Sequence, residues 1–222
     1  MASGNGYVRP SIVAAGAKVW TVGDSVTHGY LAPPASPTYE GAFRCRWYSA
    51  LTAQGRSPNF VGTVTNASDG VACGGQGHSG YNGSTAASWN ATYFAIYAAS
   101  VQASFGDPDV VSIMLGFNDG DSAAAADQVI GVVGQACATF PNAVVLVNTL
   151  YPTGSSTYAA LNARLRDEVA RLLRIGKRVK LVEMASVFGG GTPPVDLCPD
   201  GLHPSTAGYA LMGAVLENAI PY

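Results

Sequence analysis

The sequence predicts an α/β fold, a three-layer α/β/α sandwich in which helices cover both faces of a five-stranded parallel sheet. Short runs rich in β-branched and aromatic residues alternate with longer segments whose apolar residues recur every three or four positions. Residues 109–115 are nearly all apolar, as expected for a strand buried on both faces. Because the chain shows no repeat and no linker, we expect residues 1–222 to form a single domain.

The predicted elements follow an irregular lead-in over residues 1–17. Runs of β-branched and aromatic residues predict strands at residues 18–22, 59–64, 109–115, 143–149 and 178–183. Helical spacing predicts helices at residues 39–54, 85–105, 122–139, 155–175 and 205–219. Proline and glycine predict loops at residues 31–38, 65–83 and 189–199. The loop at 65–83 is long enough to indicate a functional or mobile segment.

The helix at residues 155–175 is the clearest, because its apolar residues form one stripe and its arginines lie elsewhere. That stripe consists of Leu161, Leu165, Val169, Leu172 and Leu173. In residues 39–54 the apolar positions also recur at helical spacing, and Gly55 ends the segment. Trp47 and Trp89 lie on such stripes, so we expect them in the core rather than at a sugar-binding surface.

Composition narrows the classes of partner and the cellular location. Charged residues make up 12% of the chain and its net charge is −2, which gives no reason to expect nucleic acid or an anionic membrane as a partner. No apolar run is long enough to span a bilayer. Residues 1–17 lack the pattern of a signal peptide. The scarcity of Lys and Glu and the abundance of small residues nevertheless favour a secreted protein, and a cytoplasmic one is not excluded.

Polar residues follow the predicted strands at the positions where a parallel sheet binds ligands. Ser25 follows the first strand directly, Gly80 lies in the loop after the second, and Asn118 comes just after the third. Asp200 and His203 lie in the loop after the fifth strand. Ligands of such sheets bind outside the carboxyl ends of the strands, so we expect these residues to converge. A serine hydroxyl needs an adjacent base to become a nucleophile, and His203 is the candidate.

Four segments resemble, in order, the four sequence blocks of the SGNH (GDSL-type) hydrolases. They are Gly23-Asp24-Ser25, the glycine of Gly77-His78-Ser79-Gly80-Tyr81, Gly116-Phe117-Asn118-Asp119 and Asp200-Gly201-Leu202-His203-Pro204. The segments His78-Ser79-Gly80-Tyr81 and Pro108-Asp109-Val110-Val111 are most similar to the acetylxylan-esterase-like branch, carbohydrate esterase family three. The resemblance implies a flavodoxin-like SGNH hydrolase fold and an esterase that uses no metal and no cofactor.

The resemblance also implies a role for each matching residue. Ser25 would attack an ester carbonyl, His203 would take its proton, and Asp200 would orient the imidazole ring. The oxyanion hole would consist of the backbone N–H groups of Ser25 and Gly80 and the side-chain amide of Asn118.

Neighbouring polar residues have two interpretations. Asp24, His78 and Tyr81 are candidate substrate-binding residues, although Asp24 and Asp119 also fit a role as loop-fixing hydrogen bonders. His78 fits a structural role equally well. Asp119 and Asp121 suggest a cation site, but helix N-capping explains them better.

Four cysteines, Cys45, Cys73, Cys137 and Cys198, are compatible with two disulfides, and the sequence leaves all three pairings open. Cys198 precedes Asp200, so a disulfide could tether the catalytic loop. Cys45 and Cys73 are better placed as its partner than Cys137, which ends a helix at the other side of the predicted sheet.

We therefore expect a serine esterase that removes short acyl groups, above all acetyl, from a carbohydrate or a small alcohol. One alternative is a lysophospholipase or thioesterase acting on longer acyl chains. Another is a carbohydrate-binding domain without catalysis, although such a domain would not need the whole set of catalytic residues. The oligomeric state is left open.

Overall fold

The computed structural model describes residues 16–31, 42–65 and 73–219. Most of the predicted lead-in at residues 1–17 and of the predicted loop at residues 31–38 lies outside the described residues.

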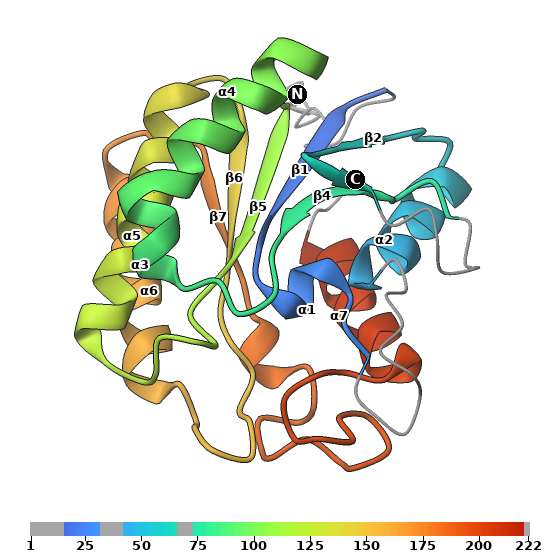
Figure 1. Ribbon diagram of the computed structural model, residues 1–222, viewed down its shortest axis with the longest axis vertical. Helices are drawn as coiled ribbons and strands as arrows, with labels where there is room; N and C mark the ends of the chain where they lie inside the picture. The colour runs from blue at the N-terminus through green and yellow to red at the C-terminus, as the bar shows by residue number, and fades with distance from the viewer. Residues whose placement is uncertain (1–15, 32–41, 66–72, 220–222) are drawn as a thin grey trace, which may run out of the picture.

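A parallel sheet forms the middle layer, and it contains all five predicted strands (Figure 1). In spatial order they are β2 (Asn59–Val61), β1 (Lys18–Gly23), β5 (Val110–Met114), β6 (Val144–Asn148) and β7 (Val179–Val182). Every residue of β5 and β6 is buried, which explains why these strands read as continuous apolar runs. The predicted α/β class is confirmed.

Two further short strands, β3 (Val64–Thr65) and β4 (Gly77–Gly80), lie in or beside the segment predicted as a loop. β2 pairs with the first half of β1, whereas β4 pairs with its carboxyl end, where Gly23 lies opposite Gly80. The predicted strand at 59–64 is interrupted at Gly62, where the chain passes so close to the backbone of His78 that a side chain would overlap it.

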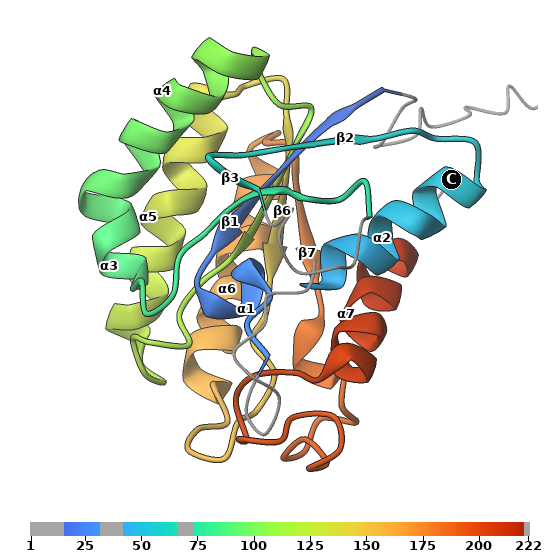
Figure 2. The ribbon, with the colours of Figure 1, turned by 45° about the vertical axis from the view of Figure 1, so that its right-hand side comes forward.

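Helices form the two outer layers (Figures 1 and 2). One face carries α2 (Ala42–Ala53) and α7 (Thr206–Ala219), and the other carries α4 (Phe94–Phe105), α5 (Ala123–Thr139) and α6 (Ala159–Arg174). The predicted helix at 85–105 begins with α3 (Ala86–Ser88) and a π-helical turn, η1 (Trp89–Tyr93), before α4. A short 3₁₀ helix, η2 (Met184–Ser186), follows β7.

The core lies on both sides of the sheet and includes the two predicted tryptophans, Trp47 and Trp89, which are fully buried. Trp20 of β1 packs against Phe94 and Phe140, with ring centroids 5.4 and 5.9 Å away. None of the helices in the described ranges is long and apolar enough to cross a membrane.

Candidate active site

Ser25 begins a single helical turn, α1 (Ser25–His28), directly after β1. Strand β1 ends at Gly23. A side chain at this position would lie 2.0 Å from Thr27 Oγ1, so only glycine lets α1 fold back onto the strand. Asp24 is the N-cap residue, and its Oδ1 accepts a hydrogen bond from the backbone N–H of Val26 at 3.0 Å. Ser25 thus presents its own N–H at a helix N-terminus, where it has no partner within the helix.

The loop before α7 brings a histidine and an aspartate to Ser25. His203 Nε2 lies 2.9 Å from Ser25 Oγ, and His203 Nδ1 lies 2.7 Å from Asp200 Oδ2. The second carboxylate oxygen, Asp200 Oδ1, accepts the backbone N–H groups of Leu202 and His203 at 2.9 and 2.7 Å. This arrangement lets the imidazole accept a proton from the hydroxyl while the carboxylate stabilises the resulting positive charge.

The Asp200 carboxylate stays ionised although it is partly buried. Burial acts to raise its pKa, but the hydrogen bonds from the His203 ring and from two backbone N–H groups outweigh burial, and the pKa is lowered overall. An ionised acid beside the imidazole is what a charge-stabilising partner requires.

The loop carrying His203 is held by contacts with other parts of the chain. Tyr151 donates its hydroxyl to the carbonyl of Leu202 at 2.7 Å. The ring of Tyr30 packs against the His203 imidazole, with 4.5 Å between centroids, and Tyr209 donates its hydroxyl to the Tyr30 carbonyl at 2.9 Å. These contacts fix the ring that faces Ser25.

An open cavity of about 300 Å³ lies over this group. Its described lining residues are Ser25, Tyr30, Asn82, Gly83, Asn118, Asp200, Leu202 and His203. Asn118 follows β5 after a tight turn in which Gly116 adopts a φ of +120°. Its Nδ2 donates one hydrogen to the Ser84 carbonyl at 2.9 Å. The amide carries a second hydrogen, which is suited to a substrate oxygen in the cavity.

A model of the GDSL-like lipase/acylhydrolase family matches residues 21–211, nearly all of the described chain. The chain belongs to this family. By this membership it is a carboxylic ester hydrolase, and the predicted SGNH (GDSL-type) resemblance is confirmed. No curated protein sequence matches the chain.

Solved structures of GDSL-like and carbohydrate esterases share the fold. A carbohydrate esterase of family 3 from Talaromyces cellulolyticus is 22% identical at a TM-score of 0.74, covering 91% of this chain and 95% of that one. A family 3 carbohydrate esterase from Clostridium thermocellum is 24% identical at a TM-score of 0.73, covering 91% and 94%. A Geobacillus acetyl-xylooligosaccharide esterase is 18% identical at a TM-score of 0.63, covering 95% and 96%.

The structure does not bring Gly80 of this GDSL-like hydrolase into the cavity. Its N–H donates to Nδ1 of His78 at 2.9 Å, and the residue is buried in β4. Glycine is needed here because a side chain would lie 2.4 Å from the backbone nitrogen of His28 in α1. Gly80 therefore allows β4 to pack against the turn that carries Ser25. Its predicted role as an oxyanion donor finds no support in this geometry.

Asp24 and His78 are not among the described lining residues of the cavity, and both side chains are fully buried. Burial raises the pKa of the Asp24 carboxyl to about 7, with a further rise from Asp119 and an opposing effect of the Val26 N–H. Burial lowers the pKa of His78 well below its usual value, and the charges of Arg44 and His28 lower it further. In this structure Asp24 caps α1 and a neutral His78 accepts the Gly80 N–H.

Tyr81 lines a second cavity beside the first, together with Asn82 and Gly83, which line both. Asn82 and Gly83 were not predicted as site residues. Ser84 N–H bonds to the Tyr81 carbonyl at 3.1 Å, which closes a turn with Gly83 at a φ of +71°. The Asn82-Gly83 dipeptide, typical of such turns, is the sequence signal that could have identified them.

Asp119 and Asp121 serve as helix caps, as predicted, but for helices distant in sequence. Asp119 accepts the N–H groups of Ala86 and Ala87 at the start of α3, at 2.7 and 3.2 Å. Asp121 accepts those of Ala159 and Leu161 at the start of α6, at 2.9 and 3.0 Å. The loop that carries Asn118 is thereby fixed to two helices. The described residues contain no group of His, Cys, Asp or Glu that could hold a metal ion.

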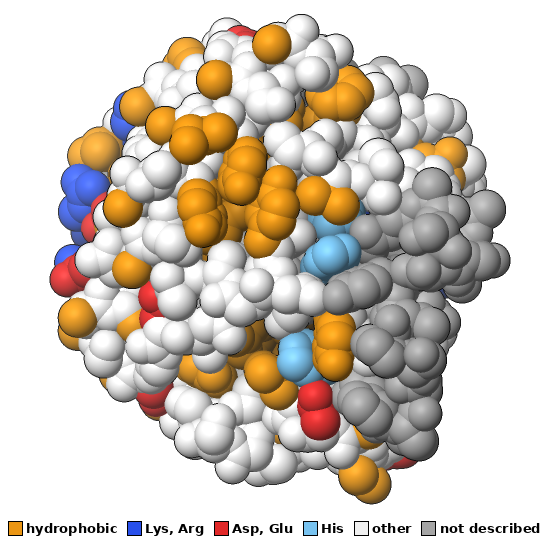
Figure 3. Space-filling model, viewed as in Figure 1, with side chains coloured by type: hydrophobic (Ala, Val, Ile, Leu, Met, Phe, Trp, Pro, Cys, Tyr) orange, Lys and Arg blue, Asp and Glu red, His pale blue; other side chains and the backbone are white. Residues whose placement is uncertain are grey.

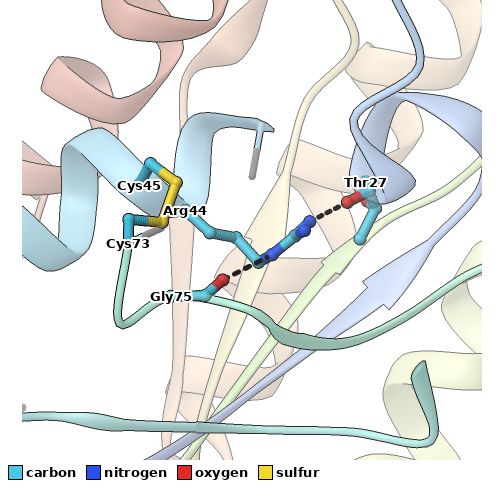
Figure 4. Close-up of a disulfide and its surroundings, with 5 residues drawn as sticks. All are labelled: Thr27, Arg44, Cys45, Cys73 and Gly75. Atoms are coloured by element: carbon cyan, nitrogen blue, oxygen red, sulfur yellow. Dashed lines mark hydrogen bonds between the residues drawn. A yellow bond between two sulfur atoms is a disulfide. The ribbon is translucent and has the colours of Figure 1, made fainter. Parts of the chain in front are cut away.

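Of the pairings that the sequence leaves open, the structure contains one disulfide among the described residues, and it does not involve the loop with Asp200 and His203. Cys45 pairs with Cys73 (Figure 4), whereas Cys198 is a free, buried thiol. Burial raises the pKa of Cys198 to about 12, helped by the nearby Asp200 charge, so its thiol stays protonated and unreactive. Hydrogen bonds hold the catalytic loop instead, including those from Tyr151 to Leu202 and from the Gly154 N–H to the Gly201 carbonyl.

Arg44, beside this disulfide, is fully buried and was not predicted as a residue near the site. Figure 4 shows its guanidinium between two backbone carbonyls, that of Gly75, which accepts from Nε at 3.0 Å, and that of Thr27, which accepts from Nη1. Thr27 lies near the C-terminal end of α1, which carries the negative end of the helix dipole, so the positive charge of Arg44 is favourable there. Burial lowers the pKa of Arg44 to about 9, and a neighbouring Tyr209 opposes the shift.

Proposed function

We propose that this ester hydrolase is a serine esterase that removes short acyl groups, above all acetyl, from carbohydrates. The observation that carries the proposal is the hydrogen-bonded series from Asp200 through His203 to Ser25, which opens onto the cavity. The printed descriptions of the similar solved structures, carbohydrate and acetyl-xylooligosaccharide esterases, support the substrate class.

In the proposed reaction, Ser25 Oγ attacks the ester carbonyl carbon while His203 Nε2 takes its proton. The carbonyl oxygen gains negative charge and accepts hydrogen bonds from the Ser25 N–H and the Asn118 amide. When the intermediate collapses, the C–O bond to the sugar breaks and His203 protonates the leaving sugar oxygen, which becomes a hydroxyl group. Water then attacks the acyl-enzyme while His203 takes its proton. The bond between the acyl carbon and Ser25 Oγ breaks, His203 returns the proton to Ser25 Oγ, and the carboxylic acid leaves.

The size and the lining of the cavity favour a substrate with a short acyl group. Its volume is at the lower end of the range typical of small-molecule sites. Leu202 is the single aliphatic side chain among its described lining residues. A long acyl chain would gain affinity only by burying methylene groups against apolar walls, and this lining offers few.

The Cys45–Cys73 disulfide supports the proposal that the protein works outside the cytoplasm. Disulfides persist in oxidising compartments and are rare in the reducing cytosol.

Hydrolysis of p-nitrophenyl esters from acetate to palmitate, alongside acetylated xylan, tests the proposal. We expect kcat/KM to be highest for the acetate or propionate ester, and acetate to be released from acetylated xylan. A folded Ser25→Ala variant should be inactive. A kcat/KM that rises up to decanoate would favour the long-chain alternative, and an active Ser25→Ala variant would exclude the mechanism.

A further inference from the structure

A second cavity of about 340 Å³ adjoins the catalytic one, and no step of the proposed reaction uses it. Asn82 and Gly83 line both cavities, so the two are neighbours along one wall. The remaining described lining residues of the second cavity are Tyr81, Ser84, Thr85, Ser88, Tyr93 and Tyr97. Figure 3 shows hydrophobic side chains gathered on this face of the molecule, near histidine side chains.

The three tyrosines form a preorganised aromatic wall. Tyr81 and Tyr97 are stacked, with centroids 4.8 Å apart and ring planes 20° from parallel, and Tyr93 lies 5.6 Å from Tyr97. The ring of buried Trp89 packs against those of Tyr93 and Tyr97, with centroids 6.0 and 5.4 Å away. The Tyr81 hydroxyl is fixed by a 2.7 Å hydrogen bond to Thr63 Oγ1.

A π-helical turn accompanies this wall. Residues Trp89–Tyr93 form η1, within a segment that is otherwise α-helical. π-Helical turns are rare and are found frequently at functional sites. The turn ends at Tyr93, four residues before Tyr97, and these two rings line the same cavity. The irregular turn therefore lies where the aromatic wall is built.

The chemistry of the lining selects a neutral ligand with both apolar and hydroxyl surfaces. The described lining includes no Asp, Glu, Lys or Arg, so a phosphate or ammonium group would find no counter-charge there. Tyrosine rings offer an apolar face with a hydroxyl at the edge. A pyranose ring has the matching character, because its axial C–H bonds form an apolar face and its hydroxyl groups lie around the rim.

We infer that this second cavity is a subsite for a pyranose ring of the substrate, next to the ring whose acyl ester reaches Ser25. The inference rests on the proposed function, since it assigns the sugar part of the same substrate. Tyr97 would stack on the sugar, and the shared wall at Asn82 and Gly83 would connect this ring to the catalytic cavity.

Binding of unacetylated xylotriose and cellotriose to the Ser25→Ala protein, measured by calorimetry or NMR titration, tests the subsite without any hydrolysis. We expect at least one trisaccharide to bind, and adding Tyr97→Ala to weaken binding about 5- to 10-fold. Tyr97→Phe keeps the ring and should retain most of the affinity. Ile96→Ala is the matched control, because Ile96 is 55% exposed on the same helix and does not line the cavity.

Hydrolysis by the otherwise wild-type protein gives the second measurement. We expect Tyr97→Ala to lower the ratio of kcat/KM on acetylated xylotriose to kcat/KM on p-nitrophenyl acetate about 5- to 10-fold. Absence of trisaccharide binding, or equal effects of Tyr97→Ala and Ile96→Ala, would overturn the subsite. So would a larger effect of Tyr97→Ala on p-nitrophenyl octanoate than on the sugar ester. If trisaccharides bind but no sugar ester is cleaved, the proposed function fails and the subsite remains.

Discussion

Asn118 is the residue at which structural and catalytic roles can be separated by one substitution. Its amide has one hydrogen committed to the Ser84 carbonyl and a second suited to the cavity. The first contributes to stability in all states of the enzyme, whereas the second would act only as the substrate oxygen becomes negative.

We predict that Asn118→Ala lowers kcat by about 10²–10³ with little change in KM. Loss of the Ser84 hydrogen bond should cost only about 1 kcal/mol of unfolding free energy. Steady-state kinetics and chemical denaturation of one preparation measure both quantities. An unchanged kcat with a large loss of stability would show that Asn118 is structural.

Asp24 predicts a pH dependence of stability, because burial raises the pKa of its carboxyl group. Its pKa is about 7 in the folded protein and 3.8 in an unfolded chain, so the folded state holds a proton that the unfolded state releases. The stability contribution of Asp24 is therefore greatest below pH 3.8 and is lost as the pH rises through 7. The loss is about 4 kcal/mol at most, at roughly 1.4 kcal/mol per unit of pKa difference.

Asp24→Asn keeps an oxygen that can accept the Val26 N–H but cannot ionise. We predict that its unfolding free energy, relative to that of the unmodified protein, increases between pH 5 and pH 8. Urea denaturation at the two pH values measures the difference. Parallel curves for the two proteins would contradict the raised pKa.

At the level of elements, the short turn α1 depends on the helix beside it. The last turn of α1 receives a hydrogen bond from Arg44 of α2, which also binds the Gly75 carbonyl. The adjacent Cys45–Cys73 disulfide closes a loop of the same segment, and a loop of this length contributes about 3–4 kcal/mol through the unfolded state. Arg44 and the disulfide together fix the surroundings of Ser25.

We predict that Arg44→Met destabilises the fold by about 2 kcal/mol and lowers kcat/KM. Two carbonyls lose their donor, at about 1–3 kcal/mol each, and removal of a buried charge offsets part of this cost. Arg46→Met, two residues further along α2, is the control. Arg46 is 52% exposed and forms a surface ion pair with Glu217, so its loss should cost less than about 1 kcal/mol. A variant Arg44→Met as stable and active as the control would disprove the linkage.

Elements with a long periodic signal could be predicted from the sequence, whereas short ones could not. The five parallel strands and most of the α6 stripe follow from apolar patterns that burial enforces, although Leu173 of the predicted stripe is exposed. α1 and β4 have four residues each, and each depends on a glycine: Gly23 lets α1 fold back toward β1, and Gly80 lets β4 pack against α1. That packing joins residues more than fifty positions apart, so local patterns do not reveal it.

The same limit explains why only part of the candidate site could be predicted from the sequence. Ser25, Asn118, Asp200 and His203 could be placed at one edge because each follows a strand. Whether a side chain faces the cavity or the core depends on distant contacts. Asp24 lies beside Ser25 in the sequence yet is fully buried. The pairing of Cys45 with Cys73 likewise depends on how α2 lies against the segment before β4.

In the whole molecule, α7, the last described helix, packs on α2, which lies in the first quarter of the chain, as both ribbon views show. The contact is close at Gly213, where a side chain would lie 2.5 Å from Arg46 Cβ and 2.8 Å from the Phe43 carbonyl. Since α7 begins three residues after His203, its position helps to place the loop that carries Asp200 and His203.

Two glycine-to-alanine substitutions within helices test this packing. We predict that Gly213→Ala destabilises the protein and lowers kcat/KM, because α7 must move away from α2. Gly134→Ala in α5 is the matched control, since a side chain there meets nothing within 4 Å. It should stabilise the protein by about 0.5–1 kcal/mol, as expected for glycine replacement inside a helix. Thermal melts of both variants decide, and a stabilising Gly213→Ala would refute the close contact.

The separation of Ser25 from His203 also has a consequence for biosynthesis. The two residues whose side chains meet at 2.9 Å are 178 positions apart in the chain. At about 5–20 residues per second, the ribosome makes the nucleophile roughly ten seconds or more before its base. Until the last strand and its following loop have emerged and docked, Ser25 lacks the base that the proposed mechanism assigns to it. On that mechanism, the growing chain cannot hydrolyse esters before His203 has been made and has reached Ser25.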